Sequence, residues 1–230
     1  DNFSDLRRDT SWFICPHVNP DGAQRNAAWF RDPADLEVYG RHVHREPPGD
    51  DVEFNYPGAN HEDPKEPRPE NKAVAEFLRT GAPFRLHASL HGMAFAEGAW
   101  WLIGSEWVDR MELLRRELKA IFDGYHLGYH DIDRRGEKGF MRIEKGFSTT
   151  PSCPAMREFF LRQGDPETAR KFLPSSMELV QSFGGDPLVM VSEIPIFRIH
   201  GGGPLPDPPG DDTPFLRLRP RLAEAREEGD

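Results

Sequence analysis

The sequence predicts an α/β fold in which helices flank both faces of a mixed β-sheet. The main evidence for the sheet is two segments that have the residue pattern of β-strands. Residues 84–91 alternate apolar and polar side chains, and residues 188–199 are almost continuously apolar. Segments with apolar residues three and four positions apart separate them, as in amphipathic helices. This succession is typical of a sheet that is covered by helices.

The other elements follow from local signals. Residues 12–18 are expected to form a buried strand that ends at the turn Asn19-Pro20-Asp21-Gly22, while residues 24–40 are ambiguous. Residues 46–68 resemble a long surface segment with a short extended piece at 52–56, and residues 125–150 resemble irregular chain. A helix is expected over 69–81, with a buried face of Ala73, Val74, Phe77 and Leu78. A second helix is expected from the N-cap Ser105 to Phe122, and shorter ones over 154–163 and 166–172. The last helix is expected from Ser175, which forms a capping box with Glu178, to Gly184.

Length and composition limit the organisation and the partners. The 230 residues are enough for one sizeable domain, expected over 1–200, followed by a Pro/Gly-rich and charged tail over 201–230. The net charge of −10 argues against nucleic acid or an anionic membrane as a partner. Cys15 and Cys153 are expected to be buried thiols, with a single disulfide as the alternative. The compartment stays open, with the cytoplasm favoured.

Two residues are the best candidates for chemistry. His91 ends the alternating strand just before Gly92, and α/β sheets bind ligands beyond the carboxyl ends of their strands. Glu193 interrupts an apolar strand, where a carboxylate is costly unless it is paired or faces a cleft. His87 lies four residues before His91, about 13 Å along a regular strand, so both cannot bind one metal ion. We therefore interpret His87 as structural.

The order of four segments resembles the zinc carboxypeptidase family of metallopeptidases (M14). They are Asn19-Pro20-Asp21-Gly22, Asp51 to Pro57, Ser89-Leu90-His91-Gly92 and Ser192-Glu193-Ile194-Pro195. The resemblance implies an amide-cleaving zinc hydrolase in which His91 binds the metal. Glu193 would take a proton from water and pass it to the leaving amine, and Arg25, with Arg31 as a competitor, would stabilise the oxyanion.

The sequence departs from the family at the substrate site. Carboxypeptidases of the family carry Asn-Arg where this chain has Glu53-Phe54, and that arginine grips the free carboxylate of the substrate. Phenylalanine cannot do so. We therefore predict that Glu53, Asn55 and Arg31 bind a different substrate group. The expected substrate is a peptide, and the alternative is an acylated amino acid.

The sequence also departs from the family at the metal. The family's first two zinc ligands come from a His-x-x-Glu motif, and none of the nine histidines has Glu at that spacing. Zn2+ is therefore expected for a complete domain, of which this chain would lack the N-terminal part, and only His91 is evident as a ligand. The alternative is a non-catalytic binding domain that retains the fold. The family's mobile tyrosine would be Tyr125 or Tyr129, and either could simply pack.

Overall fold

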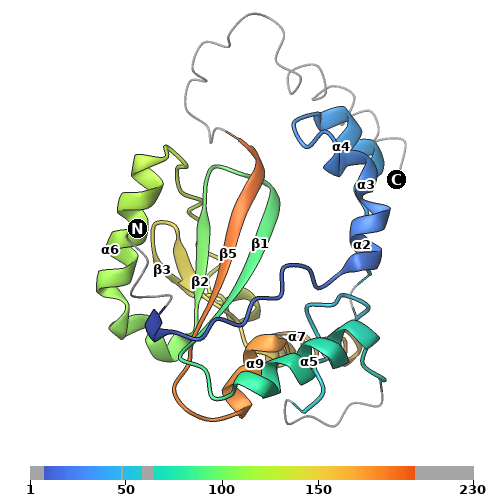
Figure 1. Cartoon of the computed structure of the whole chain (residues 1–230), viewed down its shortest axis with the longest axis vertical. Helices are drawn as coiled ribbons and strands as arrows, with labels where there is room; N and C mark the ends of the chain where they lie inside the picture. Colours follow the sequence, from blue (N-terminus) through green and yellow to red (C-terminus); the bar gives the residue numbers. More distant parts are fainter. Residues whose placement is uncertain (1–7, 48, 59–64, 200–230) are drawn as a thin grey trace, which may run out of the picture. The chain divides into compact units, whose positions relative to one another are not determined.

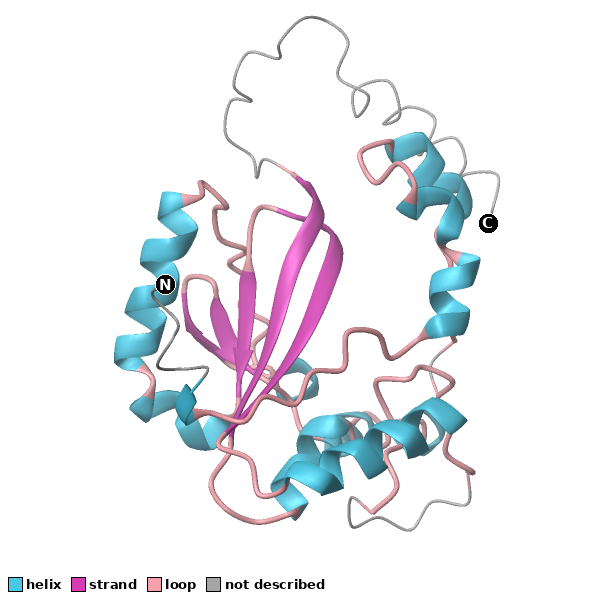
Figure 2. Ribbon diagram, in the orientation of Figure 1, coloured by secondary structure: helices cyan, strands magenta, loops and turns pink. Residues whose placement is uncertain are grey.

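The computed structural model describes residues 8–47, 49–58 and 65–199. Its sheet has five strands in the order β1-β5-β2-β4-β3, drawn in magenta in Figure 2. The strands are β1 (Leu86–Ala96), β2 (Trp100–Ile103), β3 (Arg142–Glu144), β4 (Phe147–Thr149) and β5 (Leu188–Arg198). β2 runs antiparallel to β5 and parallel to β4, which confirms the predicted mixed sheet.

The register of β1 against β5 follows from backbone hydrogen bonds near both ends. The Leu188 amide donates to the Arg85 carbonyl, and the Ile199 amide donates to the Ala96 carbonyl. Both bonds advance in the same direction along the two strands, so the pair is parallel. In a parallel ladder an amide bonds the carbonyl one residue before its opposite neighbour. This register places His91 opposite Glu193.

The chain forms two compact units. The first unit contains Pro47–His87 and Ser152–Val189, and the second contains Asp21–Glu46 and Ala88–Pro151. The predicted division into one domain over 1–200 remains a prediction, and the expected tail over 201–230 lies outside the described residues.

Helices make up much of the first unit, which holds a small apolar core. These helices are α5 (Pro69–Gly81), α7 (Cys153–Arg162), α8 (Pro166–Ala169) and α9 (Ser176–Ser182). The core brings Tyr56 together with Ala75 and Leu78 of α5 and with Leu179 and Val180 of α9. The capping box of Ser175 and Glu178 at the start of α9 is confirmed.

The buried face of α5 differs from the predicted one. Asn71, Ala75 and Leu78 are buried, whereas Ala73 and Phe77 are exposed. The reason lies in Asn71, which no apolar pattern would select. Its amide nitrogen donates to the carbonyls of Val52 and Phe54 and so ties the helix to the preceding loop. Part of the expected surface segment is therefore core.

In the second unit, helices lie on both faces of the sheet, as predicted. They include α2 (Pro20–Arg25), α3 (Ala27–Phe30), α4 (Leu36–His42) and α6 (Glu112–Gly124), with the short 3-10 turns η1 (Ser105–Arg110) and η2 (Glu137–Gly139). Phe122 of α6 stacks on Trp101 of β2, and α6 lies along the sheet beside β3 (Figure 1). Tyr39 of α4 packs edge-on against Phe95 and Phe197 on the opposite face.

Several sequence expectations are wrong. Residues 12–18 form no strand: the side chains of Trp12 and Ile14 are 56% and 71% exposed, because this segment has no ladder partner among the described residues. Asn19-Pro20-Asp21-Gly22 opens helix α2 instead of making a turn, since proline suits the first helical position. Ser105 begins the turn η1, and Met111 occupies the N-cap position of α6.

Further corrections concern residues 125–150 and one cysteine. The segment expected to be irregular supplies β3 and β4, whose three-residue strands are too short for a periodic signal. Both cysteines are free thiols, but only Cys153 is buried, and Cys15 is exposed. None of the helices in the part of the chain that the structure describes is long and apolar enough to cross a membrane.

Gly98, between β1 and β2, allows a close approach of backbone to backbone. A Cβ at this position would stand 2.2 Å from the Gly128 carbonyl carbon and 2.3 Å from the Tyr129 nitrogen. Gly98→Ala should therefore lower the free energy of unfolding by about 2 kcal/mol or more, measured by urea denaturation. Gly124→Ala is the matched control, because a Cβ there meets nothing within 4 Å. Equal effects of the two substitutions would contradict the packing at Gly98.

Candidate active site

His91 and Glu193 face each other from neighbouring strands. The prediction that His91 ends its strand is wrong, because β1 continues to Ala96 and His91 lies in its middle. His91 Nδ1 lies 3.8 Å from Glu193 Oε1, and both side chains are mostly buried, with 27% and 19% of their surfaces exposed. The separation exceeds hydrogen-bond length, but it allows both atoms to engage the same third group, such as a water molecule. Two candidates that are distant in the sequence thus share one site.

The pairing of strands explains why both side chains point to the same face. Directly opposite residues in a sheet project to one side, and His91 is opposite Glu193. Glu193 is in turn opposite Trp100 of β2. The Trp100 indole donates to Ser148 Oγ of β4, so polar groups continue across this face. α4, through Tyr39, covers the same face farther along β1 and β5.

Ser89 is a member of the site whose role the sequence analysis missed. Its Oγ lies 2.9 Å from His91 Nε2, at hydrogen-bonding distance. Residues two apart on a strand project to the same face, so the spacing Ser89-Leu90-His91 was a usable signal. The histidine therefore has a hydroxyl at one ring nitrogen and a carboxylate beyond the other.

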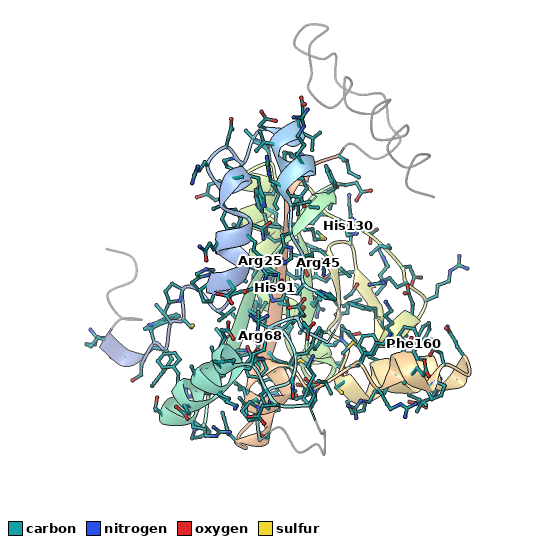
Figure 3. All side chains as sticks on the ribbon, turned by 90° about the vertical axis from the view of Figure 1, so that its right-hand side faces the viewer. Arg25, Arg45, Arg68, His91, His130 and Phe160 are labelled. Carbon is teal, nitrogen blue, oxygen red and sulfur yellow. The ribbon has the colours of Figure 1, made fainter. Side chains whose placement is uncertain are left out.

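Arg25 is held at the end of α2 by a network around Asn26. Asn26 is buried, and its amide nitrogen donates to the carbonyls of Gly22 and His44 while its oxygen accepts from the His44 amide. Arg25 Nη1 lies 3.1 Å from His44 Nε2, and a guanidinium can only donate, so that nitrogen accepts. Figure 3 labels Arg25 and His91 within the second unit. A role of Arg25 at the oxyanion stays a prediction.

The predicted substrate-binding residues lie on other parts of the chain. Arg31 is an exposed residue at the C-terminal end of α3. Glu53 and Asn55 belong to the first unit. The buried Asn55 side chain donates to the Lys65 carbonyl, and its backbone has a φ of 70°, so it shapes its own loop. Substrate binding by these three residues remains a prediction.

Other titratable groups that the sequence analysis considered are occupied elsewhere. His87 Nε2 lies 3.0 Å from Ser176 Oγ, and burial lowers the pKa of His87 to about 4. The Tyr129 hydroxyl donates to Asp123, and burial first, then that hydrogen bond, raises the pKa of Tyr129 to about 12. Tyr125 is exposed. The structure therefore gives His87 and Tyr129 a structural role in packing.

The donor set at the site does not by itself fit a catalytic zinc ion. Such an ion usually takes three protein ligands, and Nδ1 of His91 is the one imidazole nitrogen that faces Glu193. Within residues 8–47, 49–58 and 65–199, no three His, Cys, Asp or Glu residues are grouped so that they could hold a metal ion. The expected zinc site is thus not assembled from these residues.

Comparison with known proteins supports the resemblance for part of the chain. The family model of zinc carboxypeptidases (peptidase M14) matches residues 1–96. This part of the chain is zinc-carboxypeptidase-like. The matched residues include His91, near their C-terminal end, and do not extend to Glu193. The pairing of β1 with β5 brings Glu193 beside His91. No curated protein and no solved structure matches the chain.

Partial burial of His87 should make the protein less stable in mild acid. The unfolded chain binds a proton with a pKa near 6.5, whereas the folded chain does so only near 4, so the unfolded state gains protons first as the pH falls. Between pH 7 and pH 5 the free energy of unfolding should drop by about 2 kcal/mol from this group. Urea denaturation at the two pH values measures the drop.

His87→Gln should remove that part of the pH dependence, because glutamine does not titrate. His42→Gln, at an exposed position in α4, is the control and should keep the acid sensitivity of the unaltered chain. If His87→Gln leaves the difference between pH 7 and pH 5 unchanged, the half-buried His87 is not its source.

Proposed function

We propose that the protein is a metallocarboxypeptidase-like hydrolase that cleaves an amide bond. The observation that carries the proposal is the position of Glu193 beside His91, at 3.8 Å between Oε1 and Nδ1. The match of residues 1–96 to the zinc carboxypeptidase model supports the same class of reaction. In that class, zinc polarises the attacking water and the amide carbonyl.

The residues of this chain have separate tasks in the proposed reaction. Glu193, mostly buried in an apolar strand, accepts a proton from the attacking water and returns it to the leaving amine. His91 would hold the metal as one nitrogen ligand. Arg25, a permanent cation, would stabilise the negative charge that develops on the carbonyl oxygen. The remaining metal ligands are not provided by the residues that the structure describes.

The substrate class has two candidates. A peptide follows from the family resemblance. An acylated amino acid is favoured by one observation, the presence of Glu53-Phe54 in place of the carboxylate-gripping Asn-Arg pair. The backbone of Phe54 bridges to Ser175, and the Glu53 amide bonds Asp51 Oδ1, so this loop has a definite conformation without an arginine at either position. A carboxylate at Glu53 would repel a free carboxylate on either class of substrate, so the assay has to separate the two.

Hydrolysis assays test the reaction and its base together. The purified full-length protein, with zinc in the buffer, is given a set of peptides and a set of acylated amino acids. We expect release of an amine from one set, and Glu193→Gln should lower kcat by roughly 100-fold or more, because glutamine cannot accept the proton. The better substrate set identifies the class.

Glu97→Gln is the matched control for this assay. Glu97 also pairs with a histidine, since Oε2 of Glu97 contacts Nδ1 of His130 in the second unit, but it follows the C-terminal end of β1, whereas His91 lies in the middle of the strand. Its substitution should leave turnover unchanged. Full activity of Glu193→Gln would overturn the proposed base. A lack of hydrolysis of both substrate sets by the unaltered chain would favour the non-catalytic binding domain.

A further inference from the structure

We propose that His44 is a positioning residue, whose neutral ring accepts a hydrogen bond from the Arg25 guanidinium and holds that cation in place for an anionic oxygen of the substrate. The inference deepens the proposed function and rests on it for its catalytic consequence, in which Arg25 stabilises the oxyanion. Its structural part concerns only the second unit, which contains both residues. That part stands on the 3.1 Å distance from Arg25 Nη1 to His44 Nε2 and on the hydrogen bonds that fix His44.

The chemistry of the pair decides which nitrogen of His44 carries the proton. A guanidinium has only donors, so the hydrogen bond runs from Arg25 to His44 and cannot run the other way. Nε2 of His44 must therefore present a lone pair, and the neutral ring keeps its proton on Nδ1. Histidine that is free in water carries its proton mainly on Nε2. The contact with Arg25 thus requires the less common form of the ring, which can be measured.

Asn26 fixes the backbone of His44 to the end of α2. The Asn26 oxygen accepts from the His44 amide at 2.8 Å, and the Asn26 amide nitrogen donates to the His44 carbonyl at 2.9 Å. The same side chain donates to the Gly22 carbonyl and accepts from the Trp29 indole, so both polar groups of the buried Asn26 are satisfied. Because Arg25 directly precedes Asn26, these bonds set the imidazole of His44 beside the guanidinium.

The partner of Arg25 differs from the partners of two other arginines in the second unit. Arg41 pairs with Glu37, and Arg142 pairs with Asp131, so a carboxylate neutralises each of these cations. Arg25 makes no ion pair with any residue that the structure describes, and its hydrogen bond goes to a neutral ring. That bond uses one N–H and leaves the positive charge. An anionic oxygen can therefore bind the guanidinium without first displacing a carboxylate.

The exposed position of Arg25 explains why its guanidinium has to be held. Arg25 is exposed, whereas His44 is half-buried. A long side chain loses much rotamer freedom when it is fixed. A hydrogen bond that exists before the substrate binds moves this cost from the reaction to folding. The net contribution of a typical hydrogen bond corresponds to roughly a fivefold preference for the held position.

Nitrogen-15 NMR of the histidine rings tests the structural part without any turnover. The spectra are recorded at pH 8, above the ordinary titration range of histidine, and His44→Gln identifies the His44 signals. We expect Nδ1 to be the protonated nitrogen of His44 in the unaltered protein. Arg25→Ala removes the donor, so the proton should move mainly to Nε2 and the two nitrogen shifts should change accordingly.

Arg41→Ala is the matched control for this measurement. It also removes an exposed guanidinium from the second unit, but one that pairs with Glu37 instead of a histidine. The His44 shifts should therefore stay as they are. A proton on Nε2 of His44 in the unaltered protein, or the same change in both arginine variants, would overturn the positioning role. This arm stands even if the protein hydrolyses nothing, so its failure is distinct from a failure of the proposed function.

Kinetics test the catalytic part on whichever substrate set is hydrolysed. His44→Ala should lower kcat roughly fivefold with KM little changed, because Arg25 is then held only part of the time. In the Arg25→Ala background the same substitution should have no further effect, since His44 acts through Arg25 alone. His44→Gln, whose side-chain oxygen can accept from Arg25, should recover most of the rate. Additive losses in the double variant, or no recovery with glutamine, would contradict a positioning role in turnover.

Discussion

The parallel pairing of β1 with β5 is the constraint on which the candidate site depends. Side chains alternate between the faces of a strand, so a slip of one residue would move either His91 or Glu193 to the opposite face. Backbone hydrogen bonds near both ends of the pair fix the register, from Leu188 to Arg85 and from Ile199 to Ala96. The distance between the imidazole and the carboxylate is thus a consequence of backbone geometry.

The burial of the two faces of β1 is the reverse of what the alternation of apolar and polar residues suggests. The apolar set that includes Leu86 and Leu90 would be assigned to a core, yet these side chains are 44% and 80% exposed. The polar set that includes Ser89 and His91 is more buried. β1 is an edge strand of the sheet, and alternation identifies two faces without saying which one the other elements cover.

The strength of the local signal decided which elements could be predicted. β5, α5 and α9 were predicted closely, because a long apolar run, a proline at the start of a helix and a capping box act within a few residues. β3 and β4 were missed since three residues give no period. Residues 12–18 were wrongly predicted to be a strand, because an apolar run becomes a strand only where a second strand completes its hydrogen bonds.

The sequence by itself determined the chemical candidates of this protein: a histidine in a strand of alternating side chains, a carboxylate within an apolar strand, and the zinc-carboxypeptidase-like segment that the family model matches over residues 1–96. Only the tertiary structure decided that His91, Glu193 and Ser89 share one site, and that Asn26 and Asn71 each hold a loop of their own unit. The physical reason is that the strand pattern of each segment is local, whereas its neighbour in the sheet and its covered face are set by long-range hydrogen bonds and packing.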